Sequence, residues 1–271
     1  MAAPNAITTR QLLRLIGTPQ APVLVDVRTD ADFNDDPCLI PAAVRHSYDD
    51  IDGIRKLIAD RPCVVICQKG KKLSQGVVSW LQTGGARAEY LEGGTLAWRA
   101  TPGAPSVPVS ALPAIIDGGT LWVTRHRPKI DRIACPWLIR RFVDARAQFL
   151  FVAPTEVPGV AGHFGATAFD VEGTDWSHRG DRCTFDTMLD EFNLHSEPLD
   201  RVATIVRAAD TNRHDLSPEA AGLLALSVGL SRQYRDDQQQ LKAGLHLYDA
   251  LYRWARDGAG ETHDWPAGHG Q

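Results

Sequence analysis

The stretch from Val64 to Leu81 constrains the fold most, because it predicts a strand, a short loop and a helix in immediate succession. The apolar run ends at Cys67, a glycine follows at Gly70, and helical spacing begins at Leu73. In open α/β sheets, ligands bind beyond the carboxyl ends of the strands, where the amino ends of helices favour anions. A thiol at this position, with lysines beside it, is expected to favour the thiolate, which is the nucleophilic form.

Strands and helices alternate on both sides of this stretch. Strands are predicted at 21–28, 63–67 and 88–91, and helices at 8–17, 51–59, 74–83 and 93–98. Residues 32–41 are rich in Asp, Asn and Pro and are predicted to form a loop. The alternation is typical of an α/β domain with a parallel sheet and helices on both faces.

A segment rich in proline and glycine, residues 101–119, separates the two halves of the chain, as a linker or surface segment would. We predict a first domain at 1–103, a linker at 104–119 and a second domain at 120–271.

The second half predicts a mostly helical α+β domain. A strand at 120–125, a helix at 131–145 and a strand at 148–152 form a predicted βαβ unit. Residues 159–181 are predicted to be a largely irregular functional loop. Four helices are predicted after it, at 184–192, 198–209, 218–230 and 236–256.

Composition narrows the class of protein. The net charge of −4 argues against a non-specific nucleic-acid binder, which carries a strongly basic face. No segment approaches eighteen uninterrupted apolar residues, and the amino end has no signal-peptide pattern. The five cysteines are scattered without a CxxC pair, which fits reduced thiols. We therefore expect a cytoplasmic protein with small-molecule partners and without membrane or nucleic-acid partners.

Residues 7–100 resemble a single rhodanese domain. The motifs that carry the resemblance are Leu24 to Arg28 with Phe33, Ile40 to Val44, Cys67 to Lys72, and Leu91 to Trp98. The family pattern around the cysteine is C-x-x-G-x-R, and here Lys72 replaces the arginine, which keeps the charge but loses the planar fork. A loop of this length fits sulfur transfer, whereas the related phosphatases have a loop one residue longer.

The resemblance implies a sulfurtransferase with Cys67 as the catalytic nucleophile. Sulfane sulfur would pass from a small-molecule donor such as thiosulfate to a thiol acceptor without any cofactor. Backbone N–H groups of the loop would stabilise the sulfur anion. The expected substrate-binding residues are Gln68, Lys69, Gly70, Lys71, Lys72 and Arg28. The alternatives are that Cys67 is an inert buried cysteine, as Cys63 is expected to be, and that Arg28 forms a structural ion pair with Asp26.

The second half resembles the C-terminal domain of the chromate-resistance protein family. The resemblance rests on the motifs Arg127 to Phe142, His178 to Asp186, Ala209 to Thr211, Pro218 to Gly222, Asp236 to Asp237 and Tyr248 to Tyr252. It implies a chromate or oxidative-stress response, and it raises two hypotheses about sites in this domain.

The first hypothesis is a metal site. Imidazole and carboxylate groups at His178, Asp186, Asp210 and Glu219 suit Mn, Fe or Zn, and Asp237 could join them. Some relatives carry a histidine where this chain has Arg207. The alternatives are a loop histidine and charges at helix ends.

The second hypothesis is an oxyanion site. Arg125, Arg127, Lys129 and Arg132 lie between a predicted strand end and a helix start, where chromate or sulfate could bind. The alternative is a solvated basic loop.

We therefore expect a rhodanese-like sulfurtransferase that forms a Cys67 persulfide and is linked to a chromate or oxidative-stress response. Two other functions stay open. The first is a module that binds or senses an oxyanion or persulfide without turnover. The second is a metal-dependent (Mn or Fe) enzyme in the second domain that acts on reactive oxygen.

Overall fold

The structure is a computed structural model that describes residues 5–261. The outer ends of the two predicted domains, residues 1–4 and 262–271, lie outside the described residues. Within residues 5–261, none of the helices combines the length and the apolar character needed to cross a membrane.

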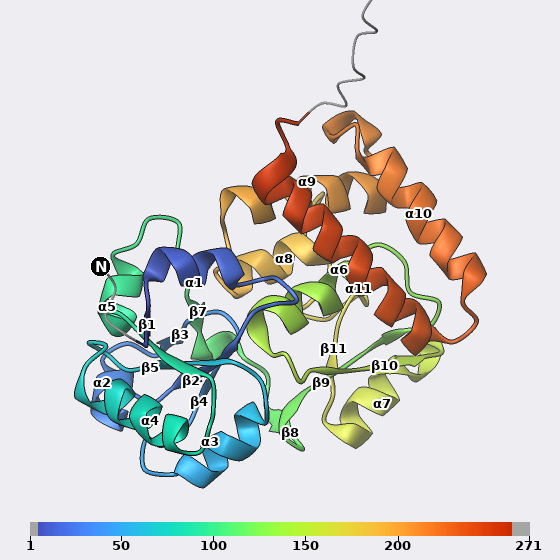
Figure 1. Cartoon of the computed structure of the whole chain (residues 1–271). Helices are drawn as coiled ribbons and strands as arrows, with labels where there is room; N and C mark the ends of the chain where they lie inside the picture. Colours follow the sequence, from blue (N-terminus) through green and yellow to red (C-terminus); the bar gives the residue numbers. More distant parts are fainter. Residues whose placement is uncertain (1–4, 262–271) are drawn as a thin grey trace, which may run out of the picture.

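The first half contains a five-stranded parallel sheet in the order β1-β6-β5-β2-β4 (Figure 1). The strands are β1 (Ala6–Ile7), β2 (Val23–Asp26), β4 (Ala43–Arg45), β5 (Cys63–Ile66) and β6 (Ala88–Leu91). The helices are α1 (Thr9–Leu15), α2 (Asp30–Asn34), α3 (Ile51–Ile58), α4 (Lys72–Thr83) and α5 (Gly94–Arg99). The predicted α/β class is confirmed, although α2 and the short strand β3 (Cys38–Leu39) occupy part of the predicted loop at 32–41.

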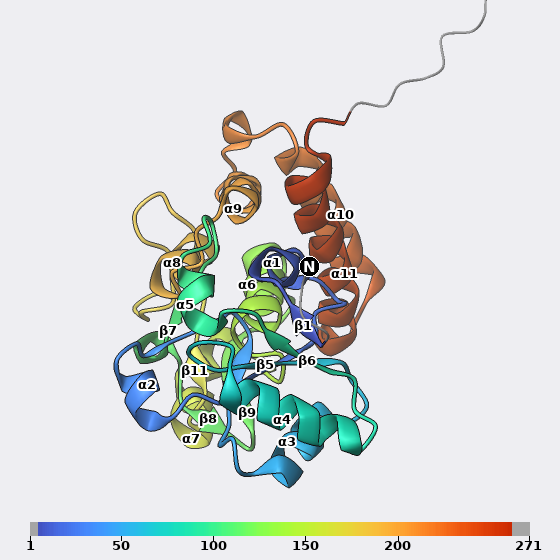
Figure 2. The same ribbon diagram turned by 60° about the vertical axis from the view of Figure 1, so that its left-hand side comes forward.

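Side-chain alternation along the strands assigns the helices to two faces of this sheet. Val25 and Val65 belong to one apolar cluster with Ile54 of α3 and Leu81 of α4. Leu24, Val64 and Ile66 belong to another, with Leu12 of α1 and Trp98 of α5. Accordingly, α3 and α4 lie together on the side of the sheet away from α1 (Figure 2).

The predicted linker carries short ordered elements. These are β7 (Val107–Pro108), the 3-10 turn η1 (Val109–Ala111) and β8 (Ile115–Ile116). Strand β7 pairs with β3 of the first half, and β8 pairs with β9 of the second half. The predicted linker thus forms backbone hydrogen bonds with both halves of the chain.

The second half contains a small sheet in which β9 (Gly119–Arg125) pairs in parallel with β10 (Gln148–Val152) and β11 (Thr167–Ala168). Helix α6 (Asp131–Leu138) and the π-helical turn η2 (Ile139–Val143) connect β9 to β10, as the βαβ prediction requires. The prediction for 159–181 was partly wrong, because α7 (Val157–Phe164) and β11 begin the expected loop. Val157 anchors α7 by packing on Val123 of β9.

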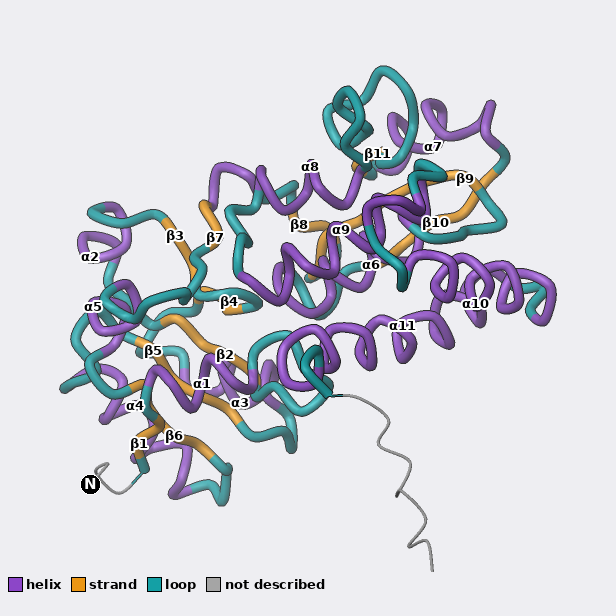
Figure 3. The backbone as a smooth tube through the Cα atoms, turned by 90° about the horizontal axis from the view of Figure 1, so that it is seen from above, coloured by secondary structure: helices purple, strands orange, loops and turns teal. Residues whose placement is uncertain are grey.

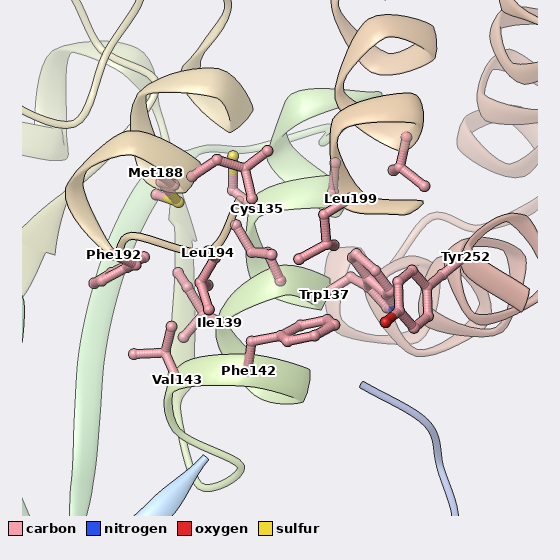
Figure 4. Close-up of a cluster of buried hydrophobic side chains, with 14 of the residues drawn as sticks. Cys135, Trp137, Ile139, Phe142, Val143, Met188, Phe192, Leu194, Leu199 and Tyr252 are labelled. Atoms are coloured by element: carbon pink, nitrogen blue, oxygen red, sulfur yellow. The ribbon is translucent and has the colours of Figure 1, made fainter. Parts of the chain in front are cut away.

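Helices dominate the remainder of the second half (Figure 3). They are α8 (Thr184–Glu191), α9 (Glu197–Asp210), α10 (Ala220–Gln233), α11 (Asp237–Arg253) and the π-helical turn η5 (Trp254–Gly258). The rings of Trp137, Phe142 and Tyr252 meet in the core between these helices and α6 (Figure 4).

The two halves share one apolar core. Leu12 and Trp98 belong to the same buried cluster as Phe142 and Tyr252. The Phe142 ring lies against Gly17, where an added Cβ would be 2.2 Å from ring atom Cζ. Its carbonyl accepts a hydrogen bond of 2.8 Å from the Ala42 N–H. The first and second halves are therefore packed into one body.

Candidate functional site

Cys67 lies directly after β5, at the carboxyl end of a central strand, and is 5% exposed. Its Sγ is 3.1 Å from the Oγ of Ser74, in the first turn of α4. The backbone between them makes a tight loop that returns into the helix. A hydroxyl beside the sulfur can donate a hydrogen bond to a thiolate or accept one from a thiol.

Two glycines let the loop pack against the start of α5. Gly70 (φ +62°) and Gly94 (φ +60°) both have left-handed backbone conformations, which favour glycine. A Cβ on Gly94 would lie 2.1 Å from the Cys67 carbonyl oxygen. The N–H groups of Thr95 and Leu96 donate to the carbonyls of Cys67 and Gln68, both at 3.1 Å. The first turn of α5 therefore holds the backbone of Cys67 and Gln68 in place.

The lysines of the loop point away from the protein interior. Lys69, Lys71 and Lys72 are exposed, and Gln68 is half-buried. The three lysine side chains can therefore contact an anionic sulfur donor that approaches from solvent. The other cysteine of this strand, Cys63, is enclosed, and burial raises the pKa of its thiol to about 11, which suits a packing role.

Arg28 is enclosed rather than open to substrate. Its Nη2 is 2.6 Å from Asp26 Oδ2, and neither side chain is more than 1% exposed. The guanidinium also donates to the carbonyls of Asp36 and Cys38 and lies over the Phe33 ring. This arrangement fits the alternative interpretation, in which Arg28 anchors the loop that follows β2.

A second group of polar residues gathers in the second half. His178 Nε2 lies 3.2 Å from Asp210 Oδ2, 3.5 Å from Asp170 Oδ1 and 3.6 Å from Asp131 Oδ2. We call these four residues the aspartate–histidine cluster. Asp131 begins α6, Asp170 follows β11, His178 lies in the next loop and Asp210 ends α9. Asp131, Asp170 and His178 can each offer one ligand atom within 4.8 Å of the others.

The charges of the cluster perturb one another. Hydrogen bonds to Asp170 and Asp210 raise the pKa of His178 to about 10. Burial raises the pKa of Asp131 well above its usual range, and the charges of Asp210 and Asp170 add to this effect. Burial alone would also raise the pKa of Asp170, but hydrogen bonds from His178 and Arg125 outweigh it, so that pKa is lowered.

The backbone at the cluster is strained. Ile130, just before Asp131, has φ +40°, and Asp170 has φ +53°. A positive φ is a genuine outlier for a β-branched residue such as isoleucine. Such conformations gather at functional sites, where the surrounding structure enforces them.

The basic residues expected to bind an oxyanion divide into two groups. Arg125 and Arg132 both pair with Asp170 Oδ2, at 2.9 and 3.2 Å, and so border the aspartate–histidine cluster. Arg127 turns toward the end of α10, where it donates to the carbonyls of Ser231 and Tyr234. Lys129 is exposed. The structure thus does not bring the four cations together in one site.

Two expected metal ligands lie outside the cluster. Asp186 caps α8 by accepting the Cys183 N–H at 3.0 Å, and it pairs with Arg207 at 2.6 Å. Glu219 precedes α10, is exposed and bonds to the Ser217 hydroxyl. Asp186 and Glu219 therefore lie outside the cluster, and the structure brings His178 and Asp210 together with two other carboxylate partners. Asp237 also lies outside the cluster, since its carboxylate accepts the Arg127 N–H.

Those partners are Asp131 and Asp170, which the sequence analysis did not propose as ligands. For each of these two residues, the position in the chain relative to a strand was a signal that could have been used. Asp131 begins the helix after one parallel strand, and Asp170 follows another strand of the same sheet. Carboxyl ends of parallel strands share one edge of a sheet, which is the usual position of a ligand site. The signal from Asp170 was hidden because β11 itself is only two residues long.

The two groups of residues are separate. Among the described residues, the hydrogen bonds and ion pairs of residues 67–72 stay within the first half. Those of the aspartate–histidine cluster stay within the second half. The chain therefore presents two candidate sites that no hydrogen bond or ion pair of the described residues joins.

Comparison with known proteins supports this division. Residues 8–101 match the family model of the rhodanese-like domain. Residues 122–255 match the family model of the ChrB C-terminal domain. Protein ChrB of Cupriavidus metallidurans is 32% identical over 136 residues, which are 49% of this chain and 40% of that protein. The match thus spans well under two thirds of the curated relative.

Solved structures resemble the first half. A rhodanese-related protein from Thermoplasma volcanium is 23% identical with a TM-score of 0.33, covering 38% of this chain and 97% of that one. A rhodanese-like domain protein from Staphylococcus aureus is 29% identical with a TM-score of 0.31, covering 35% and 90%. A thiosulfate sulfurtransferase from Pseudomonas aeruginosa is 23% identical with a TM-score of 0.32, covering 38% and 19%.

The motifs, the two matched regions and the two candidate sites agree on one organisation. The chain carries a rhodanese-like domain over residues 8–101 and a ChrB C-terminal domain over residues 122–255.

Proposed function

We propose that the protein is a sulfurtransferase that carries sulfane sulfur as a persulfide on Cys67, and that it serves a chromate or oxidative-stress response. The observation that carries the proposal is the position of the thiol. Cys67 stands at the carboxyl end of β5, in a tight loop closed by Gly70 and Gly94, with the Ser74 hydroxyl 3.1 Å from its sulfur. The link to stress rests on the family of the second half.

The reaction has two half-reactions. The Cys67 thiolate attacks the outer sulfur of thiosulfate, the S–S bond of the donor breaks, and sulfite leaves with the bonding electron pair. The thiolate of a small acceptor then attacks the terminal sulfur of the persulfide, and Cys67 leaves as a thiolate. Each step exchanges one bond to the transferred sulfur for another, with no net oxidation or reduction. The two steps therefore require no cofactor.

The residues around Cys67 have distinct roles in this scheme. The Ser74 hydroxyl donates a hydrogen bond to the anionic sulfur, which stabilises it. Lys69, Lys71 and Lys72 attract the dianionic donor from solvent. In this scheme the backbone N–H groups between Cys67 and Lys72 hold the terminal sulfur, as successive N–H groups of a nest hold a small anion.

Mass spectrometry of the intact protein after incubation with thiosulfate tests the proposal. We expect a gain of about 32 Da, one sulfur atom, that a reducing thiol removes. Cys67→Ser should abolish the gain. Ser74→Ala should slow sulfur uptake by roughly 2- to 10-fold, because it removes one hydrogen bond to the sulfur. Cys38→Ser is the matched control, since Cys38 lies outside the loop and is only half-buried.

The rival function is a module that binds an oxyanion or persulfide without turnover. Steady-state assays with thiosulfate and a thiol acceptor separate the two. Saturable thiosulfate binding with no sulfite release would favour the rival. A Cys67→Ser variant that keeps the full sulfite-release rate of wild type would show that Cys67 is not the nucleophile and would overturn the proposal.

A further inference from the structure

The aspartate–histidine cluster has no part in sulfur transfer at Cys67. It differs from an ordinary ion pair because one imidazole nitrogen faces three carboxylates. We propose that Asp131, Asp170, His178 and Asp210 form a binding site for one divalent cation of the Mn²⁺, Fe²⁺ or Zn²⁺ class.

Four separate segments bring the cluster together. Asp131 lies at the start of α6 and Asp170 after β11. His178 lies in the loop before α8, and Asp210 at the end of α9. The imidazole Nε2 lies 3.2 to 3.6 Å from one oxygen of each of the three carboxylates. Asp131, Asp170 and His178 can each offer one ligand atom within 4.8 Å of the others. Asp210, 3.2 Å from the imidazole, would complete the set after its partly exposed side chain shifts toward the ion.

A buried orphan oxygen points to a missing ligand. Asp131 is 1% exposed, and its Oδ2 accepts the Thr184 N–H at 2.7 Å. Its Oδ1 is buried and has no hydrogen-bond partner. A buried carboxylate oxygen without a partner is costly, and most such atoms in proteins are paired with a donor, a water or an ion. Asp131 Oδ2 is the oxygen that faces His178, so a cation bound by both oxygens of this carboxylate would supply that partner.

Outer groups hold the ligands in place, as they do around metals in proteins. The Thr184 N–H fixes Asp131, and the Thr184 hydroxyl donates to Asp170 Oδ1 at 3.0 Å. Arg125 and Arg132 hold Asp170 by its other oxygen, Oδ2. One backbone group and one hydroxyl of the same residue thus orient two of the four ligands.

The donor set selects the class of ion. Three carboxylates and one imidazole are hard or borderline ligands, which suit Mn²⁺, Fe²⁺ and Zn²⁺ and disfavour Cu⁺. The side chains of His178 and Asp210 are 39% and 20% exposed, so one side of the ion would face solvent. Arg125, also partly exposed, would stand beside that open side and could hold an anion next to the metal.

The alternative is a structural network in which protonated His178 bridges the three aspartates without a metal. Isothermal titration of untagged full-length protein, stripped with a chelator, distinguishes the two. We expect one equivalent of Mn²⁺ or Zn²⁺ to bind per chain and to raise the melting temperature. Asp131→Asn and His178→Gln should each weaken binding by at least about tenfold.

Glu219→Gln is the matched control, because that carboxylate is exposed and lies outside the cluster. Its affinity for the ion should equal that of wild type. If Asp131→Asn does not fold, His178→Gln still decides, since its side chain is partly exposed. The proposal is overturned if no stoichiometric binding occurs, or if Asp131→Asn or His178→Gln binds the ion as tightly as Glu219→Gln.

Discussion

His195, in the loop between α8 and α9, is a single side chain with a pH-dependent contribution to stability. Its Nδ1 is 2.8 Å from Asp200 and its Nε2 is 2.8 Å from Asp190, which also pairs with Arg182. The hydrogen bond to Asp200 is the main cause of a raised pKa, with Asp190 adding to it against partial burial. The protonated ring therefore stabilises the folded state.

The sign of this contribution follows from linkage. A raised folded pKa gives stability that is complete below the unfolded value of about 6.5 and disappears as the pH rises through the folded pKa. We expect His195→Gln to lower the melting temperature most near pH 5 to 6, and progressively less at more alkaline pH. His246→Gln is the control, because that side chain is 75% exposed. A deficit that is constant or grows with pH would contradict this assignment.

Single residues differ in how readily their roles follow from the sequence. The position of Cys67, in a loop between a strand and a helix, was predictable because the strand, the glycine and the lysines around it are all within a few positions. The grouping of Asp131 with Asp170 was not predictable, because 38 residues lie between them and the pairing of β9 with β11 brings them together. Asp186 and Glu219 have side chains that could bind a metal, but Asp186 caps α8 and Glu219 accepts a hydrogen bond from the Ser217 hydroxyl.

At the scale of elements, the contact between the Cys67 loop and the start of α5 decides the geometry of the first site. Gly94→Ala would force a left-handed φ on alanine and place its Cβ 2.1 Å from a backbone oxygen. We expect a loss of about 1 to 3 kcal/mol in the free energy of unfolding, measured by urea denaturation, together with slower persulfide formation.

Gly76→Ala is the control for this prediction. Gly76 lies within α4, and an added Cβ there meets no atom within 4 Å. Alanine should therefore stabilise the helix by roughly 0.5 to 1 kcal/mol. Equal stability and reactivity of wild type and Gly94→Ala would show that the contact with α5 does not shape the loop.

Helices and strands were predictable where their apolar periodicity extends over enough residues to be recognised. The strand at 148–152 and the strand at 88–91 have the expected bounds, and the helix at 51–59 ends one residue earlier than expected. Helix α7 was missed because Gly159 and Gly162 lower its helix propensity, while the packing of Val157 on β9 supplies the compensating stability. Two-residue strands such as β1 have no period at all, and exist only through pairing with a distant strand.

At the scale of the whole molecule, the composition predicts a linker at 104–119, but it does not predict the core that the two halves share. Leu12, Trp98 and Phe142 have the spacing of ordinary core residues within their own elements. Nothing local marks them as partners in one cluster. Apolar burial is non-directional, so a sequence pattern shows that a side chain is buried but not which half of the chain covers it.

Phe142 is the residue in which this joint core can be tested. Its ring contacts Trp137 and Tyr252 of the second half and lies against Gly17 of the first. Phe142→Ala should cost about 3 to 5 kcal/mol, and because both halves lose contacts, they should still unfold together. Calorimetry and urea denaturation of the full chain should then show a single transition, shifted to lower temperature and lower denaturant.

Phe164→Ala makes the same chemical change at a side chain that is 55% exposed, so it should alter the free energy of unfolding by no more than about 0.5 kcal/mol. Two resolved transitions in wild type, with only one of them displaced by Phe142→Ala, would mean that the halves fold independently and that their contact contributes little. A single transition displaced as a whole is expected instead, because Phe142 fills a cluster that extends from α1 to α11 without interruption.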